Sequence, residues 1–113
     1  MIEATIISYL IDKTSAAKNV YAERPTSPPT KYIIVEKTGS DRTNRVDRAT
    51  IAIQSIGGTM LDAASLNEEV KAKMDAIISQ DSIGACRLNS DYNFTDQTTK
   101  EYRYQAVFDI THY

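Results

Sequence analysis

The sequence predicts an α+β fold, with a mixed or mostly antiparallel sheet of about four to five strands and two helices on one face of the sheet. Residues 48–56 alternate apolar and polar side chains, which is typical of a strand with one buried face. Residues 60–80 repeat apolar side chains at helical spacing. Several shorter β-branched runs are bounded by proline or glycine. A chain of 113 residues is expected to form a single domain, residues 1–113.

Two segments have the apolar spacing of amphipathic helices. Residues 2–13 form the first, which is too short to be stable alone and must pack on the rest of the protein. Residues 60–80 form the second, where Thr59 is placed to cap the N-terminus and Asp62 to answer it in a capping box. The apolar stripe of this longer helix comprises Ala63, Leu66, Val70, Met74 and Ile77.

Five segments are expected to be strands and the polar segments between them loops. The strands are residues 20–23, as a short edge strand, and residues 31–39, 48–56, 83–88 and 101–113. The connector RPTSPPT precedes the second strand, because its prolines exclude both a helix and a central strand. Residues 40–47 are expected to be a polar loop, and residues 89–96 an acidic loop rich in turn-forming side chains.

Composition and charge exclude several classes of protein. The formal net charge of −2 gives no overall attraction to nucleic acid or to an anionic membrane. Cys86 is the only cysteine, so an internal disulfide is excluded, as is typical of a reducing cytosol. The first residues show neither a basic leader nor a long apolar run. We therefore expect a soluble domain with no signal peptide and no membrane span.

The residues offer little for catalysis or metal binding. Cys86 and His112 could form a nucleophile–base pair if the last two strands are neighbours, but no third residue is placed to orient the histidine, and a buried apolar cysteine is favoured. Asp91, Asn93 and Asp96 could offer oxygen ligands to calcium, but the glycine and the closing glutamate of an EF-hand loop are missing. Asx side chains that bond their own backbone are the favoured interpretation. The sequence predicts no enzyme, no cofactor and no metal.

Two polar segments have the composition of protein-binding surfaces. Residues 37–48 mix four basic with two acidic side chains and hold no aromatic ring to stack on a base, which favours a solvated loop or a protein contact over nucleic acid. Tyrosine and arginine are enriched at interfaces, although tyrosines also line cores with their hydroxyls in water. The candidate partner-binding residues are Arg42, Arg45 and Arg48 in this segment and Asp91, Tyr92, Asn93 and Phe94 in the acidic loop.

Three segments resemble small structural proteins from the head–tail region of long-tailed bacteriophages and prophages, and among these the tail terminators, also called tail-completion proteins. The segments are VYAERPTSPPTKYIIVEKTGS, VDRATIAIQSIGGTMLDAASLNEEVKAKMDAI and RLNSDYNFTDQTTKEYRYQAVFDITHY. The resemblance spans nearly the whole chain. Its most specific parts are EKTG, DRATIAIQS and LNSDYNFTD followed by YRYQAVFDI.

The resemblance implies a structural virion protein without an enzymatic step. Such a subunit assembles as a homo-hexameric ring, caps the tail tube at full length, ends tube polymerisation and forms the head–tail joining interface. Its partners would be further copies of itself, the tail tube protein and the head–tail connector. The resemblance implies no membrane contact, and DNA at most passing through the ring lumen without specific binding. The protein would belong to the tail or neck of the virion and assemble in the cytoplasm of a bacterial host.

Alternatives of other kinds stay open at this stage. One is a different role in the same region of the virion, as a head–tail adaptor or a minor tail protein. Another is a small-molecule-binding α+β domain with its pocket between helix and sheet. An enzyme built on Cys86 and His112 is the least favoured.

Overall fold

The computed structural model describes residues 1–96, 98–99 and 101–113. Its elements, in chain order, are α1 (Ile2–Leu10), β1 (Val20–Tyr21), β2 (Tyr32–Thr43), β3 (Val46–Gly57), α2 (Met60–Asp75), the 3₁₀ helix η1 (Ile77–Ser79), β4 (Ile83–Asn93) and β5 (Tyr102–His112). The strands form a five-stranded sheet in the order β1-β2-β3-β5-β4. β1 pairs with β2 in parallel and the other pairs are antiparallel, so the predicted α+β fold with a mixed sheet is confirmed.

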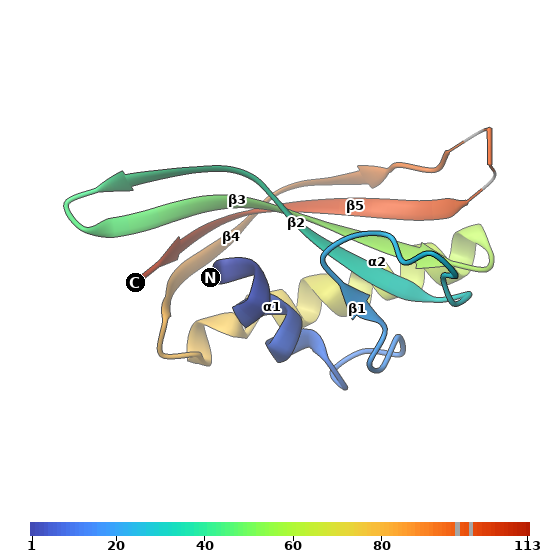
Figure 1. The fold of residues 1–113 in the computed structure, drawn as a ribbon, viewed down its shortest axis with the longest axis horizontal. Coiled ribbons are helices and arrows are strands. Elements are labelled where there is room, and N and C mark those ends of the chain that lie inside the picture. The colour runs from blue at the N-terminus through green and yellow to red at the C-terminus, as the bar shows by residue number, and fades with distance from the viewer. Residues whose placement is uncertain (97, 100) are drawn as a thin grey trace.

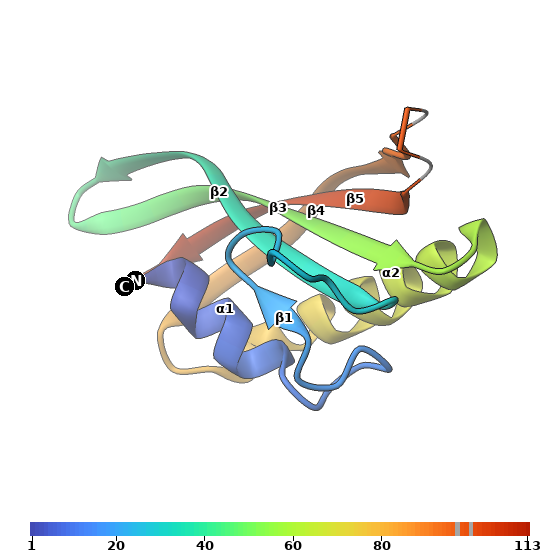
Figure 2. The same cartoon turned by 45° about the vertical axis from the view of Figure 1, so that its right-hand side comes forward.

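The molecule has two layers, with both α-helices packed on the same face of the sheet (Figure 1). The face of the sheet that points away from the helices is called the outer face below. The sheet is longer than its helical layer, and the β2–β3 hairpin projects well beyond the helices (Figures 1 and 2). The molecule is correspondingly elongated, with principal extents of 44 × 26 × 24 Å.

The core lies between the helices and the middle of the sheet. α1 contributes Ile2, Ile6 and Leu10, which confirms the predicted amphipathic face of this helix. The predicted stripe of α2 is buried, and it continues through Ile77 in η1. The sheet contributes alternate side chains, because successive residues of a strand point to opposite faces. These are Ile33, Val35, Ala49, Ile51, Ile53, Ala106, Phe108 and Ile110.

Both helices are shorter than the sequence pattern predicts. The first ends at Leu10 rather than residue 13, because Ile11 is extended and Asp12 has a positive φ of 62°, which turns the chain. The second ends at Asp75, and the remaining apolar residues continue as η1. The predicted N-cap is confirmed, since the amide of Asp62 donates to Thr59 Oγ1 over 3.1 Å, whereas the reciprocal bond of a capping box from the Thr59 amide to the Asp62 side chain is not among the hydrogen bonds of the described residues. Gly57, just before this cap, has no room for a side chain, since a Cβ there would lie 2.6 Å from the Ala63 nitrogen.

The two predicted loops between strands are wrong in large part. Residues 40–43 and 46–47, expected in a polar loop, belong to β2 and β3, which pair continuously up to Thr43 and Val46. Residues 89–93, expected in the acidic loop, belong to β4. Both segments expose most of their side chains, so they lack the alternation of buried and polar residues that marks a strand in sequence. Of the helices described, none is long and apolar enough to cross a membrane.

Candidate assembly surfaces

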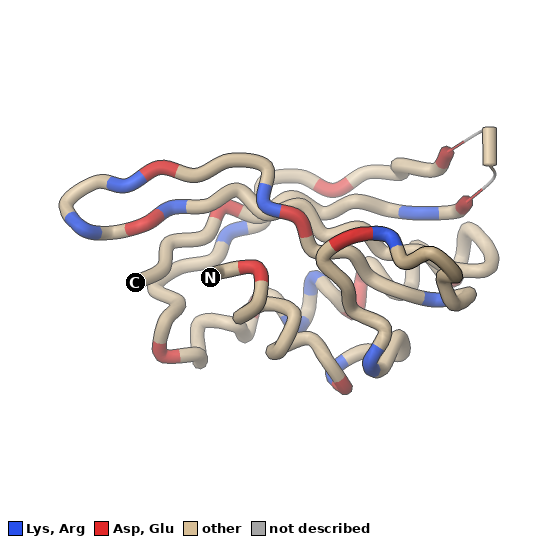
Figure 3. The backbone as a smooth tube through the Cα atoms, in the orientation of Figure 1, with Lys and Arg blue, Asp and Glu red and all other residues tan. Residues whose placement is uncertain are grey.

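The β2–β3 hairpin consists of a buried part and a projecting part. In β2, Tyr32 to Val35 are buried and every residue from Glu36 to Thr43 is exposed. The projecting part, residues 36–48, is called the arginine end below. Basic and acidic residues are interspersed along it (Figure 3). It therefore offers side chains of both signs to a partner without strong attraction to a polyanion.

A two-residue turn closes the arginine end. Asn44 and Arg45 have φ angles of 53° and 68°, and Thr43 pairs directly with Val46. Positive φ at both central positions is the type I′ turn, whose twist matches that of a hairpin. Asparagine tolerates this conformation, but arginine at the second position has to adopt backbone angles that glycine would accept without strain. The turn holds the Arg45 side chain at the very tip of the molecule.

The structure places the three candidate arginines of this end on three different surfaces. Arg42 lies on the helix-facing side, with Nε 3.5 Å from Asp47 Oδ1. Arg48 lies on the outer face, opposite Asp41, where it lines a shallow hollow of about 270 Å³ with Arg87 and Asp109. Arg45 occupies the tip. The three candidate arginines therefore do not share one surface of the hairpin.

At the other end of the sheet, an exposed aromatic pair stands on the outer face of the β4–β5 hairpin. Tyr92 and Phe94 are 42% and 41% exposed, and their rings meet edge to face with centroids 6.0 Å apart. Arg103 lies over the Phe94 ring at 4.9 Å and donates from Nε to the Phe94 carbonyl oxygen over 2.7 Å. Gln105 donates to the Tyr92 hydroxyl. These four residues are called the aromatic end below.

Asp91 and Asn93, predicted in the same candidate site, face the helices instead. Asp91 forms an ion pair with Lys71 of α2, which also contacts Glu68 at 2.7 Å. Asn93 donates to Met60 Sδ at 3.6 Å. Because residues 91 to 93 are strand, alternate side chains point to opposite faces. The four candidate residues therefore separate into two that bind α2 and two that face outward.

A partly exposed polar cluster links Arg24 of the proline connector and Tyr32 of β2 to Glu101, beside the aromatic end. The Tyr32 hydroxyl donates to Glu101 Oε2 over 2.7 Å, and Arg24 Nε lies 3.4 Å from the same oxygen. Arg103 Nη1 lies 3.7 Å from the other carboxylate oxygen of Glu101. Burial, followed by the hydrogen bond to Glu101, raises the pKa of Tyr32 to about 12. Neither Glu101 nor Arg103 was singled out in the sequence, although strand alternation places Arg103 on the same face as Gln105.

The environment of the Cys86 thiol does not activate it as a nucleophile. Cys86 is half-buried against the core, and its burial, with a smaller effect of the Asp75 charge, raises the pKa of the thiol to about 11. A nucleophilic cysteine requires a lowered pKa. The candidate calcium ligands also disagree with a metal site, because Asp96 bonds the backbone amides of Thr98 and Thr99. Within residues 1–96, 98–99 and 101–113, no group of three acidic, histidine or cysteine side chains could hold a metal.

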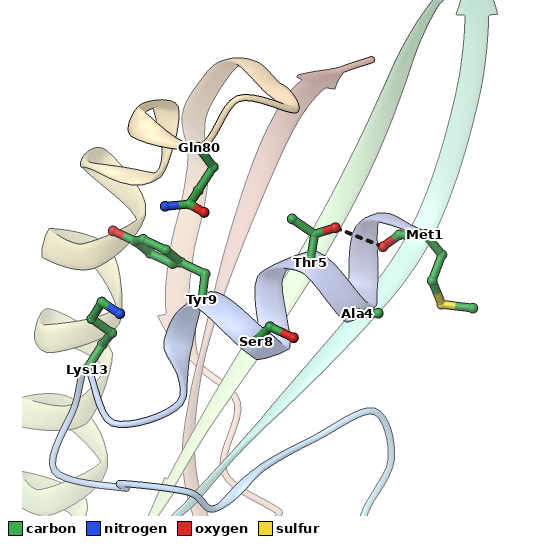
Figure 4. Close-up of a pocket in the computed structure, with 7 residues that line it drawn as sticks. All are labelled: Met1, Ala4, Thr5, Ser8, Tyr9, Lys13 and Gln80. Carbon is green, nitrogen blue, oxygen red and sulfur yellow. Dashed lines mark hydrogen bonds between the residues drawn. The ribbon is translucent and has the colours of Figure 1, made fainter.

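A hollow of about 480 Å³ runs along the exposed side of α1, lined by Met1, Ala4, Thr5, Ser8, Tyr9, Lys13 and Gln80 (Figure 4). Two of its polar side chains, Tyr9 and Lys13, already have partners within the chain. The Tyr9 hydroxyl donates to the Lys73 carbonyl oxygen over 2.7 Å, and Lys13 Nζ lies 5.2 Å from the Tyr9 ring centre. This hollow lies outside the helical layer, whereas the predicted ligand pocket would lie between helix and sheet. That interior is filled by core side chains.

The comparisons with known proteins give a distant structural likeness. No family model matches the chain, and no curated protein matches it. Among solved structures, it is similar to a chain described as "Virion of native gene transfer agent (GTA) particle". That match has 13% sequence identity and a TM-score of 0.47, and it covers 96% of this chain and 84% of that chain. A likeness at this level carries no argument about function.

Proposed function

We propose that this protein is a structural virion subunit that caps the phage tail tube, ending its polymerisation and forming the head–tail joining interface. Three segments that together span nearly the whole chain resemble tail terminators, and the fold agrees with the α+β subunit that this resemblance implies. The proposed role requires no catalytic step, and its activity lies in the shape and chemistry of binding surfaces.

The observation that carries the proposal is a sheet that extends beyond its helical layer. The projecting residues of β2 bury no side chain within the chain, and yet they hold a long, regular hairpin. Ordering residues costs conformational entropy, and side chains that stay in water contribute little burial to offset this cost. Such a hairpin is therefore not explained by the stability of the domain alone. Rigid projecting elements with exposed charged and aromatic side chains are where binding surfaces are commonly placed.

The two ends of the sheet suit two different contacts. The arginine end presents Arg45 at a tip and Arg48 on the outer face, which suits a mainly polar contact with the tail tube or the connector. The aromatic end presents Tyr92 and Phe94, which suits a partly apolar contact. Identical subunits that contact each other through two different surfaces form head-to-tail interfaces, and such interfaces generate a ring when the rotation between neighbours closes. A ring placed at the end of a tube blocks the addition of further tube subunits.

A tube-growth assay tests the capping role. Purified tail tube protein is allowed to polymerise with increasing amounts of this chain, and tube lengths are measured by electron microscopy. We expect substoichiometric amounts to stop growth and the double variant Arg42→Ala, Arg45→Ala to lose this effect. Unchanged tube growth at an excess of the wild-type chain contradicts the proposal. An adaptor would bind the connector and leave tube growth unaffected.

DNA binding is tested separately by measuring affinity for duplex DNA at several salt concentrations. We expect no specific binding, because the basic and acidic side chains of the arginine end are mixed. An affinity that falls steeply with added salt would instead identify the arginines as phosphate ligands.

A further inference from the structure

Both edges of the sheet are open along most of their length. β1 pairs only with Ile33 and Ile34, so the edge of β2 from residue 36 to residue 43 has no strand partner in the part of the chain that the structure describes. β4 forms the opposite edge, and residues 84–93 of this strand are exposed or half-buried. Open edges present unpaired backbone donors and acceptors, which are templates for pairing with another chain.

We propose that copies of this chain join edge to edge, with residues 36–43 of one copy pairing antiparallel with residues 85–92 of the next. The sheet would then run without interruption from subunit to subunit. The inference rests on the proposed function for the closure into a ring, whereas the pairing itself is argued from the two edges.

The direction of pairing follows from the strand order. Within one sheet, β2 is antiparallel to β3, β3 to β5, and β5 to β4, so β2 and β4 run in opposite directions. A second copy placed beside the first in the same orientation therefore offers its β4 antiparallel to β2. This arrangement uses two different edges, which makes the contact head-to-tail and repeatable.

One register brings opposite charges together on matching faces. When Asp41 lies opposite Arg87 of the second copy, Lys37 lies opposite that copy's Asp91. Asp41 and Arg87 are both on the outer face, since they pair with Arg48 and Asp109 in their own sheet. Lys37 and Asp91 are both on the helix-facing side, since they pair with Ile51 and Ala106. Cross-strand pairs of opposite charge stabilise a sheet only when they share a face.

The irregularities of the two strands coincide in this register. β2 shifts its register between Lys37 and Gly39, and β4 shifts between Leu88 and Ser90. These bulges come within one residue of facing each other. Each changes which face the following side chains occupy, so both charge pairs keep matching faces only because the two shifts lie at the same level.

Pairing of like edges lacks this match. Two copies of β2 that place Lys37 opposite Asp41 set these side chains on opposite faces, and two copies of β4 that place Arg87 opposite Asp91 do the same. The unlike pairing also uses charged side chains that are exposed or only partly paired within the chain. Arg87 lies 3.5 Å from Asp109 Oδ2 but is 82% exposed, and Lys37 and Asp41 form no ion pair with the described residues. Asp91 contacts Lys71 through Oδ2, and its Oδ1 has no partner among those same residues.

Disulfide trapping tests the register. In a Cys86→Ser background, the pair Ser40→Cys and Leu88→Cys places one thiol on each edge at facing, helix-side positions. Directly opposed residues in an antiparallel pair have Cα atoms about 4.5–5.5 Å apart, which suits a disulfide. The matched control is Ser40→Cys with Ser90→Cys, which has the same number of thiols but places the second on the outer face. Each single-cysteine variant can give no covalent species larger than a dimer.

After mild oxidation at high protein concentration, alone and with tail tubes, we expect the facing pair to form a ladder of covalent oligomers above dimer on a non-reducing gel. The control pair should form at least tenfold less. Equal ladders from both pairs, or no ladder from the facing pair, would overturn the proposed pairing. Co-sedimentation of the Cys86→Ser chain with tail tubes separates the two proposals. Tube binding without a ladder removes the edge pairing alone, and a ladder without tube binding removes the capping role alone.

Discussion

The two ends of the sheet differ in how far the rest of the chain holds them. Beside the aromatic end, Lys71 of α2 binds Asp91, and Glu101 contacts both Arg24 of the proline connector and Tyr32 of β2. At the arginine end, the exposed pair of Arg42 and Asp47 joins only the two strands of the hairpin itself. The first end is fixed to the body by contacts that cross between elements, whereas the second projects freely. Polar segments of similar composition can therefore differ in role. At one end of the sheet their side chains bind other elements of the same chain, whereas at the other end they are free to bind a partner.

The largest effect on stability is expected from the loss of the part-buried hydrogen bond between Tyr32 and Glu101. Tyr32→Phe keeps the ring in the core but removes the hydrogen bond to Glu101 and leaves a partly buried carboxylate oxygen without that donor. We expect the free energy of unfolding to fall by about 1–2 kcal/mol. Urea unfolding followed by circular dichroism at pH 7 measures it. An unchanged midpoint would show that the hydrogen bond between Tyr32 and Glu101 does not stabilise the fold.

The same hydroxyl predicts a pH dependence. The pKa of Tyr32 is raised to about 12 in the folded chain, so the unfolded state loses this proton first as pH rises past 10. The stability that Tyr32 contributes is therefore complete below pH 10 and is lost as pH approaches 12. The difference in unfolding free energy between the wild type and Tyr32→Phe should shrink across that window. A constant difference would contradict the raised pKa.

The aromatic pair should affect assembly more than folding. The double variant Tyr92→Ala, Phe94→Ala removes rings that are 42% and 41% exposed, so we expect a loss of about 1 kcal/mol in unfolding free energy and roughly tenfold weaker assembly. Leu61→Ala is the matched control, because this apolar side chain is 79% exposed and belongs to α2 rather than to the outer face of the sheet. Sedimentation velocity measures assembly. A large loss of stability with unchanged assembly would mark the pair as part of the core.

A smaller change in the free energy of unfolding is expected when an ion pair is removed at either end of the sheet. Lys71→Met breaks contacts with Asp91 and Glu68 and is expected to cost about 0.5–1 kcal/mol. Arg42→Met removes a more exposed pair at 3.5 Å and should change stability by no more than about 0.3 kcal/mol. Thermal unfolding of both variants at low and moderate salt makes the comparison. Equal losses of unfolding free energy in the two variants would contradict the distinction between an end that is held by other elements and an end that projects freely.

The smallest effect is a gain in stability at the hairpin tip. Arg45 has a φ of 68° at a turn position that favours glycine. Arg45→Gly should raise the free energy of unfolding by about 0.5 kcal/mol, because the relief of backbone strain exceeds the greater chain entropy of glycine in the unfolded state. The same variant should weaken binding to the tail tube. A less stable variant would show that the arginine side chain has a structural role.

The sequence predicts the covered half of this molecule well and the projecting half poorly. The alternation at Ala49, Ile51 and Ile53 and the cap at Thr59 are local patterns with a direct physical cause, and both are confirmed. Residues 40–47 of the arginine end are predicted as a loop, because exposed strand residues do not alternate and because the Asn44–Arg45 turn lacks the usual glycine.

The prediction of the candidate partner-binding residues is affected by the same misassignment of strand residues to a loop. Once residues 89–93 are assigned to a loop, nothing separates Asp91 and Asn93 from Tyr92 and Phe94. As strand residues they divide between the helix-facing side and the outer face. The contacts of Glu101 with Tyr32 and Arg24 join segments far apart in the chain, so no local pattern could predict them. The single-domain prediction, the partners and the absence of enzymatic activity remain predictions.

The most direct test of this account is the solution mass of the wild-type chain by light scattering after gel filtration, over a range of protein concentrations and in the presence of tail tube protein. The account predicts one discrete closed assembly of more than two copies, a hexamer in the proposed role, because two unlike edges pair head-to-tail until the ring closes. A chain that remains monomeric under all these conditions, or that stops at a dimer, would contradict it.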